Sequence, residues 1–212
     1  MGAFFNKTDY CIRLETPADY HETENTVREA FWNVYRPGCT EHEILHCYRG
    51  RKDFIPELDL VMVKDNKIIG QVMYVYAEIM ADNGKKIPVM TFGPISILPE
   101  YQRHGYGKIL LDYSMKKAEK LGAGALCIEG NIGFYGKSGF VVASTKGIHY
   151  AMEPREANVP YFLLKELRPD FLEGITGVYH TPKGYFINEK NADLFDAQFP
   201  PKEKLKLPGQ LF

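Results

Sequence analysis

The chain has 212 residues, of which 45% are hydrophobic and 25% charged, the balance of an ordinary globular domain. Its 26 basic and 27 acidic residues leave a net charge of -1, so no basic excess argues for binding to nucleic acid or to an anionic membrane. No apolar run reaches the ~18 residues of a membrane span, and residues 1–7 lack the pattern of a secretory signal. We therefore expect a cytoplasmic protein with no nucleic-acid or membrane partner.

The first half of the chain contains apolar, β-branched runs typical of strands and amphipathic stretches typical of helices. In chain order we expect a strand over 10–15, helices over 19–35 and 40–48, and strands over 58–64, 67–79 and 89–98. Gly93 and Pro94 interrupt the last of these strands. Because proline cannot donate to a sheet ladder, we expect a bend or bulge at that point.

The second half opens with a glycine-bearing turn over 99–107, followed by an amphipathic helix that Gly122 ends. Further along we expect a strand over 125–129, a helix over 131–138, strands over 139–143, 161–167 and 175–180, and a short helix over 190–197. This order of elements indicates a mixed α/β (α+β) fold built around one sheet.

The turn before the amphipathic helix has the chemistry of an anion site. The first amides of a helix have no partner within the helix, and the helix dipole favours negative charge there. Gly105 and Gly107 leave those amides accessible, and Arg103 and Lys108 add positive charge. The spacing fits neither the dinucleotide-binding nor the P-loop motif. The alternative is a turn that serves only the geometry of the chain.

Two segments together resemble the GCN5-related N-acetyltransferase (GNAT) superfamily. Residues 95–107 read ISILPEYQRHGYG and match its Q/R-x-x-G-x-G/A signature, which follows an apolar strand end. Residues 129–140 read EGNIGFYGKSGF, a pattern typical of a bacterial branch of predicted acetyltransferases. The resemblance implies the GNAT fold, a mostly antiparallel sheet flanked by helices. It assigns residues 1–182 to the GNAT domain and leaves 183–212 as a C-terminal extension of unknown role.

The resemblance also implies acetyl-CoA as co-substrate, with no metal. The pantetheine arm would lie in a V-shaped opening between the strand ending near Ile97 and the strand 125–129. Backbone groups of the first strand would pair with it as an added strand would. The loop before the helix would hold the pyrophosphate. The residues assigned to the cofactor in this way are Ile95, Ile97, Gln102, Arg103, His104, Gly105, Gly107, Lys108 and Asn131.

Acetyl transfer to an amine needs a neutral nitrogen and a proton for the departing thiolate. Direct transfer within a ternary complex is what the resemblance implies. Tyr135 occupies the motif position where the superfamily places the acid. Glu129, at the carboxyl end of a strand, is our candidate for the base, and Glu78 is the alternative. The simpler interpretation of each is a structural or solvated carboxylate.

The acceptor would be a small-molecule or peptide amine. The resemblance places Phe31, Trp32 and Tyr35 at its site, although core packing is an equal explanation for the first two. Glu78 is included as a further acceptor-side candidate. The C-terminal extension could cap this site or pair with a second subunit, so a homodimer stays open.

Two alternatives have other chemistry. His42-Glu43-x-x-His46 spells the zinc-hydrolase helix motif, but no third ligand follows at the required spacing. We interpret the segment as a solvated helix without a metal. The other alternative is a module that binds acyl-CoA without turnover, which the fold alone does not exclude.

Overall fold

The computed structural model describes residues 9–211; residues 1–7, on which the absence of a secretory signal was judged, lie outside this range. The elements in chain order are β1 (Cys11–Leu14), α1 (Tyr20–Phe31), α2 (Glu41–Tyr48), β2 (Leu60–Lys64), β3 (Lys67–Ala81), β4 (Lys86–Ile97), α3 (Tyr106–Lys120), β5 (Ala125–Glu129), α4 (Ile132–Tyr135), β6 (Val141–Val142), β7 (Ile148–Tyr150), β8 (Phe162–Glu166), β9 (Gly177–Tyr179) and α5 (Glu189–Asp196). Among the helices of residues 9–211, none is both long and apolar enough to cross a membrane.

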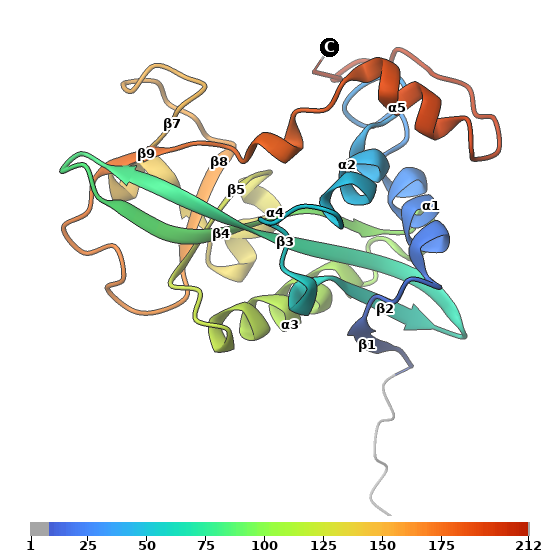
Figure 1. Cartoon of the computed structure of the whole chain (residues 1–212), viewed down its shortest axis with the longest axis horizontal. Helices are drawn as coiled ribbons and strands as arrows, with labels where there is room; N and C mark the ends of the chain where they lie inside the picture. The colour runs from blue at the N-terminus through green and yellow to red at the C-terminus, as the bar shows by residue number, and fades with distance from the viewer. Residues whose placement is uncertain (1–8, 212) are drawn as a thin grey trace, which may run out of the picture.

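One twisted sheet organises the molecule, and the long β3–β4 hairpin runs through its middle (Figure 1). The strand order is β1-β2-β3-β4-β5-β8-β6, with β9 paired to the far end of β3 and β7 paired to β9. Neighbours are antiparallel except for β4 with β5 and β7 with β9. The predicted mixed, mostly antiparallel sheet flanked by helices is therefore confirmed.

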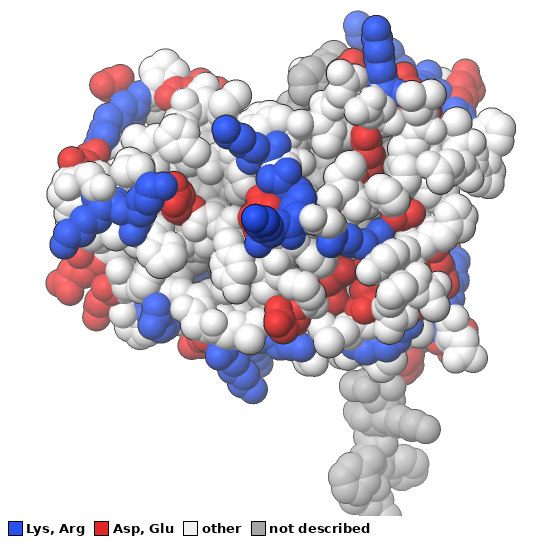
Figure 2. All heavy atoms as spheres, viewed as in Figure 1, with Lys and Arg blue, Asp and Glu red and all other residues white. Residues whose placement is uncertain are grey.

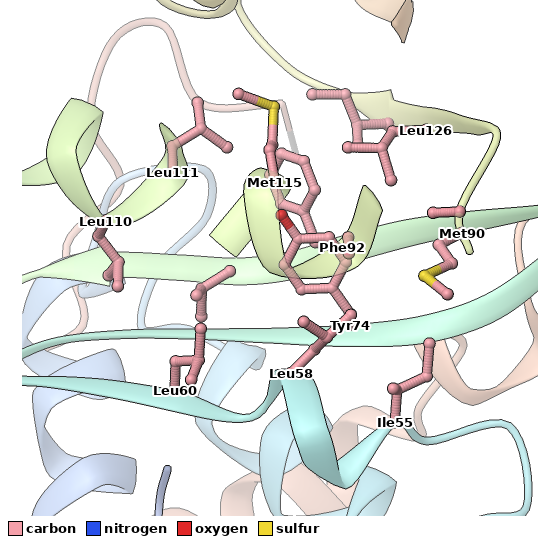
Figure 3. Packing of buried hydrophobic residues seen from close by; sticks show 14 of the residues in the cluster. Ile55, Leu58, Leu60, Tyr74, Met90, Phe92, Leu110, Leu111, Met115 and Leu126 are labelled. Atoms are coloured by element: carbon pink, nitrogen blue, oxygen red, sulfur yellow. The ribbon is translucent and has the colours of Figure 1, made fainter. Parts of the chain in front are cut away.

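Helices cover both faces of the sheet because side chains alternate along β3. Met73 and Val75 pack against the apolar sides of α1 and α2. Tyr74 faces the other way, toward α3, where its hydroxyl lies 2.8 Å from Ser114 Oγ. Figure 3 shows this second core, in which Leu110, Leu111 and Met115 of α3 pack over Tyr74 and Phe92. Each buried side chain of this size stabilises the fold by about 1.5–3 kcal/mol.

The predicted irregularity in β4 is present. Val72 faces Ile95 across the β3–β4 ladder but Tyr74 faces Phe92, so one extra residue of β4 is accommodated at Gly93 and Pro94. The strand continues through this bulge as far as Ile97. Bulges of this kind sharpen the local twist and redirect a strand. The bulge lies beyond the point at which β4 pairs with β5, while β4 stays paired with β3 as far as Ile97.

Two predicted helices differ from the structure, and one strand was not predicted. Helix α1 ends at Phe31, not at residue 35, because Trp32 is extended and Asn33 takes a left-handed φ of 58°. The Asn33 side chain holds this turn by accepting from the amides of Gly38 and Leu205. The predicted helix 131–138 is a single turn, α4, followed by a 3-10 turn over Gly136–Ser138. Strand β7 was not predicted.

The C-terminal extension packs on α1 and α2 (Figure 1). Arg28 on α1 is 1% exposed, and its guanidinium pairs with Asp196 and donates to the Pro200 carbonyl. The chain then runs beside the turn that follows α1, where the Leu211 amide donates to the Tyr35 carbonyl. The extension thus supplies the counter-ion of a buried arginine.

Candidate active site

The edge of β4 nearest β5 is open beyond a single point of contact. The two parallel strands pair at Met90 and Leu126, and no pairing between them continues toward Ile97 in the part of the chain that the structure describes. The Leu98 amide donates to Ile69 of β3 at 2.8 Å, so the backbone groups of Leu98 point toward β3. Because this direction alternates along an antiparallel ladder, those of Ile95 and Ile97 point to the open side.

Gln102 confirms this orientation. Its side-chain amide donates to the Ile97 carbonyl at 2.9 Å, which is only reachable from the open edge. The amide and carbonyl of Ile95 and the amide of Ile97 remain directed outward. An extended ligand can pair with such groups as an additional strand would.

The start of α3 lies next to this edge and offers unpaired amides. Gly105 is the N-cap with a φ of 88°, and no side chain among residues 9–211 caps the helix. The first helical hydrogen bond runs from the Ile109 amide to the Gly105 carbonyl at 3.1 Å. The amides of Tyr106, Gly107 and Lys108 therefore precede the closed part of the helix. They form an anion site together with the dipole.

The two glycines of this loop are required for different reasons. A side chain at Gly105 would meet nothing within 4 Å, but its left-handed φ strains any L-residue. A Cβ at Gly107 would make ordinary contacts of 3.6 Å with Ile97 and Phe134, so the fold itself tolerates one. Glycine at 107 keeps the adjoining amides accessible.

The charged side chains of the loop contribute less to this anion site than the backbone amides do. Lys108 is ion-paired with Asp112 on the next turn of α3, while Arg103 and His104 are exposed. Asn131 caps α4, with its side-chain oxygen accepting from the Gly133 amide at 2.7 Å. Phe134 of α4 lies beside Gly107, so the turn that begins at Asn131 adjoins the start of α3.

Tyr135 stands at the inner end of this arrangement. Its ring packs against Phe92, Phe134 and Phe140, with centroid separations of 5.9, 4.9 and 5.6 Å. Its hydroxyl forms no hydrogen bond to any residue of the described range. Burial raises the pKa of Tyr135, so the phenol stays protonated and able to donate at neutral pH.

Gly130 has a role that the sequence did not indicate. A Cβ there would lie 2.3 Å from the Tyr135 ring, so the ring rests directly on the Gly130 backbone. Any larger residue would displace Tyr135. Gly130 directly follows the predicted strand 125–129, but the sequence did not indicate that the Tyr135 ring packs on it.

Glu129 ends β5 and accepts two hydrogen bonds on one carboxylate oxygen. The donors are the hydroxyls of Tyr150 at 2.7 Å and Thr181 at 3.0 Å. Tyr150 belongs to β7, which was not predicted, and Thr181 follows β9. Neither residue was identified from the sequence, because the contacts span 21 and 52 positions of the chain.

Comparison of the sequence with known protein families identifies its family. Residues 24–140 match the acetyltransferase (GNAT) family over more than half of the chain. The chain belongs to this family. It is accordingly an acyltransferase of the N-acetyltransferase type. No curated protein sequence matches the chain significantly.

Solved structures share the fold of this acetyltransferase. A GNAT family N-acetyltransferase (YhbS) from Escherichia coli in complex with CoA is 19% identical, with a TM-score of 0.71 over 84% of this chain and 92% of its own. A GNAT family acetyltransferase from Brucella melitensis in complex with acetyl-CoA is 23% identical, with a TM-score of 0.66 over 84% and 98%. At these identities the likeness concerns the fold.

The predicted acceptor-side residues of the acetyltransferase do not form one group. Phe31 packs against the core between α1, α2 and the sheet, with its ring 6.1 Å from that of the half-exposed Tyr35. Trp32 turns to the C-terminal extension, where its indole donates to the Glu203 carbonyl at 2.9 Å. Glu78 is exposed and pairs with Lys86. It lies four residues along β3 from Tyr74, roughly 13 Å away.

The segment between β9 and α5 adds residues that sequence analysis missed. Tyr185 in this segment donates to the Gly93 carbonyl at 3.0 Å, which ties the segment to the bulge of β4. Figure 2 shows the surface hollowed at the top, between the region of β7 and the region of α5. The segment crosses beneath this hollow, so Thr181 and Tyr185 lie in the chain that connects its two sides.

The interpretation of the His42–His46 segment as a solvated helix is wrong. His42 and Glu43 are buried, because Phe195 and Phe199 of the extension pack on the His42 ring. His46 is exposed and faces Glu24 instead. Within residues 9–211, no three histidine, cysteine, aspartate or glutamate side chains are grouped to hold a metal ion. The motif is part of the packing between α2 and the extension.

Cys39, His42 and Asp196 are arranged like the triad of a cysteine hydrolase, but they lack its chemistry. Cys39 Sγ lies 3.5 Å from His42 Nδ1, and His42 Nε2 lies 3.1 Å from Asp196 Oδ1. Burial raises the pKa of the Cys39 thiol, and burial lowers the pKa of His42 to about 4. The pair is therefore neutral at pH 7 and supplies no thiolate nucleophile.

Proposed function

We propose that this acetyltransferase moves the acetyl group of acetyl-CoA to a primary amine by direct transfer in a ternary complex. The observation that carries the proposal is the open β4 edge at Ile95 and Ile97 beside the unpaired amides that begin α3. One feature suits an extended amide-containing arm, and the other suits a diphosphate. The CoA and acetyl-CoA named for the similar structures from E. coli and B. melitensis support the same ligand.

The backbone does most of the binding in this proposal. Ile95 and the Ile97 amide pair with the pantetheine arm, and Gln102 fixes the end of β4 by holding the Ile97 carbonyl. The amides of Gly107 and Lys108 bind the pyrophosphate. Asn131 orients the turn that closes the site beside Gly107. An outward-pointing backbone amide of β4 is also the donor for negative charge that develops on the thioester oxygen.

Proton transfer falls to two side chains. Tyr135 donates a hydrogen bond to the departing sulfur, since its phenol is protonated and unpaired within residues 9–211. Glu129 accepts the proton of the attacking amine through a water, because a lysine-type amine with a pKa of ~10.4 is almost entirely charged at pH 7. The hydroxyls of Tyr150 and Thr181 hold the Glu129 carboxylate in place.

Calorimetry with CoA and a thiol-release assay across a panel of amines test the proposal together. We expect CoA to bind, and Gly107→Val to abolish that binding because its side chain covers the amides. Thiol release with one class of amine completes the assignment. Binding without release from any amine would instead identify a non-catalytic acyl-CoA-binding module. Absence of CoA binding would overturn the proposal as a whole.

The cellular location belongs to the same proposal. Cys39 and Cys127 are free and buried. Free thiols persist in reducing compartments. We therefore place this acetyltransferase in the cytoplasm, as expected from the sequence.

A further inference from the structure

The segment between β9 and α5 contacts two parts of the candidate site. The Thr181 hydroxyl donates to the Glu129 carboxylate at 3.0 Å. Further along the same segment, the Tyr185 hydroxyl donates to the Gly93 carbonyl at 3.0 Å. One short stretch of chain therefore connects the carboxyl end of β5 with the bulge of β4.

The Tyr185 side chain is held by close packing, so its hydroxyl has a defined direction. A Cβ at Gly184 would lie 2.5 Å from the Tyr48 ring and 2.6 Å from Arg51 Nε. Glycine therefore lets the 3-10 turn that contains Tyr185 lie directly against the end of α2. The rings of Tyr48 and Tyr185 pack with their centroids 4.9 Å apart. Burial raises the pKa of Tyr185, so the phenol stays protonated and donates at neutral pH.

The Gly93 carbonyl is separated from the Ile95 amide by very little freedom of rotation. Because peptide units are planar, the only torsions between the two groups are φ and ψ of Pro94. The proline ring holds φ at roughly −65°. A hydrogen bond that fixes the Gly93 carbonyl therefore restricts the direction of the Ile95 amide to what a single torsion allows.

Of the two outward amides of β4, that of Ile95 lies nearer along the strand to the proposed proton donor. Tyr135 packs on Phe92, with ring centroids 5.9 Å apart, and Ile95 is closer to Phe92 in the chain than Ile97 is. The sulfur and the carbonyl oxygen of a thioester are bonded to the same carbon. A thioester with its sulfur beside Tyr135 thus has the Ile95 amide as the nearer donor for its oxygen.

We propose that Tyr185 is a positioning residue for thioester activation, because its hydrogen bond to the Gly93 carbonyl aims the Ile95 amide at the thioester oxygen. The inference rests on the proposed function and gives the C-terminal extension, to which Tyr185 belongs, a part in the reaction. Tyr185 acts through the backbone of β4 and not by contact with the reacting atoms. The amide polarises the carbonyl, and no bond to Tyr185 is made or broken.

Infrared spectroscopy of bound acetyl-CoA, labelled with carbon-13 at the thioester carbonyl, tests this inference without an acceptor. A hydrogen bond to the carbonyl oxygen lowers its stretching frequency, so we expect a lower frequency in the wild-type complex than in free acetyl-CoA. Tyr185→Phe keeps the ring on Tyr48 but removes the donor. The variant should lose about half of the shift or more, because a misaligned hydrogen bond is much weaker. Its Kd for acetyl-CoA, measured by calorimetry, should be unchanged.

Tyr48→Phe is the matched control, because it removes a hydroxyl from the ring that packs on Tyr185. Tyr48 is buried, and its hydroxyl has no hydrogen-bond partner within residues 9–211. The control should keep the whole infrared shift. With the most reactive amine of the thiol-release panel, Tyr185→Phe should lower kcat roughly tenfold and leave the KM for acetyl-CoA unchanged. Tyr48→Phe should alter neither constant.

The outcomes separate this inference from the proposed function. A full shift in Tyr185→Phe, or no shift in the wild-type complex, would overturn the role of Tyr185 while acetyl-CoA binding stands. An equal loss of the shift in both variants would also overturn it, because the loss would then come from the packing of the two rings. So would a Tyr185→Phe variant whose affinity for acetyl-CoA falls as much as its kcat, since the residue would then only support the fold. Failure of the wild-type chain to bind acetyl-CoA would overturn the proposed function itself.

Discussion

The two sides of the candidate site are built in different ways. The side proposed for the cofactor comes from one stretch of chain, from Ile95 to Tyr135, and uses mainly backbone groups whose direction follows from strand and helix geometry. The residues around Glu129 and the predicted acceptor-side residues come from segments far apart in sequence. These are the turn after α1, the end of β5, β7, the segment after β9 and the C-terminal extension.

The side proposed for the cofactor therefore uses features that any chain can supply, whereas the other side uses features particular to this chain. Backbone amides and an open strand edge recognise the same diphosphate and amide-containing arm whatever side chains surround them. The other side is formed by side chains and by a C-terminal extension that stabilises the helices beneath it. Substitutions on the two sides should therefore affect different measurements.

The largest expected effect concerns stability on the acceptor side. Asp196→Asn removes the nearer of the two carboxylates beside Arg28, which is 1% exposed, and leaves only Glu29, whose Oε1 lies 3.8 Å from the guanidinium. We expect a loss of about 3–5 kcal/mol in the free energy of unfolding, measured by chemical denaturation. The control is Asp193→Asn, whose exposed pair with Lys204 should change stability by less than about 1 kcal/mol. Equal effects in the two variants would show that the extension does not stabilise α1.

Tyr135→Phe should separate chemistry from binding. The substitution keeps the ring between Phe92 and Phe140 but removes the proton donor. We expect kcat to fall on the order of 100-fold, with the Kd for CoA unchanged. Tyr113→Phe, at an exposed position of α3, serves as the matched control and should leave both constants unchanged. An unaltered kcat in the Tyr135 variant would exclude the phenol as the donor.

Gly130→Ala should weaken the same proton donation indirectly, because it displaces Tyr135. The new methyl group would lie 2.3 Å from the Tyr135 ring, which has to move away from its position over the backbone. We expect kcat to fall roughly tenfold, with a small loss of stability. Gly136→Ala is the matched control, because its methyl group would lie 3.5 Å from Ile132, an ordinary contact. Similar rates for the two variants would contradict the packing role assigned to Gly130.

The smallest effect, per pH unit, is a pH dependence of stability that comes from Asp59, the residue before β2. Burial, and then the neighbouring Glu15 carboxylate, raise the pKa of Asp59 to about 9, while Arg49 and Gln71 oppose the shift. Between pH 4 and 9 the folded chain holds a proton that the unfolded chain releases, so stability falls as pH rises. Asp59→Asn should remove that slope, which is at most about 1.4 kcal/mol per pH unit, so the variant gains stability relative to wild type as the pH rises from 5 to 8. If the melting temperatures of the two proteins change with pH in parallel, Asp59 is not the source of the slope.

Much of the fold could be predicted from the sequence because local patterns determine it. Apolar, β-branched runs indicated the strands β2, β3 and β4, and Gly93-Pro94 indicated the irregularity within β4. The glycine-rich loop indicated the start of α3. The opening beside Ile97 was implied by the resemblance to the GNAT superfamily and not by these local patterns.

The rest depended on contacts between distant segments. The burial of His42 comes from Phe195 and Phe199, more than 150 positions away, and no local pattern indicates it. Helix α1 ends early because Asn33 bonds to a residue of the extension as well as to Gly38. The hydroxyl partners of Glu129 lie on a three-residue strand and in a loop, too short to give a periodic signal.

The hydrogen bond from Gln102 to the Ile97 carbonyl has a consequence for solution behaviour. An open strand edge is a template on which a strand of another molecule can add, and proteins that keep such edges tend to aggregate. Gln102 occupies the last outward acceptor of β4, and the contact with β5 closes the strand at Met90. The exposed template is thereby reduced to a few backbone groups on either side of a bulge. That length is sufficient for a narrow linear ligand, but it offers too few hydrogen bonds to bind a strand of another molecule.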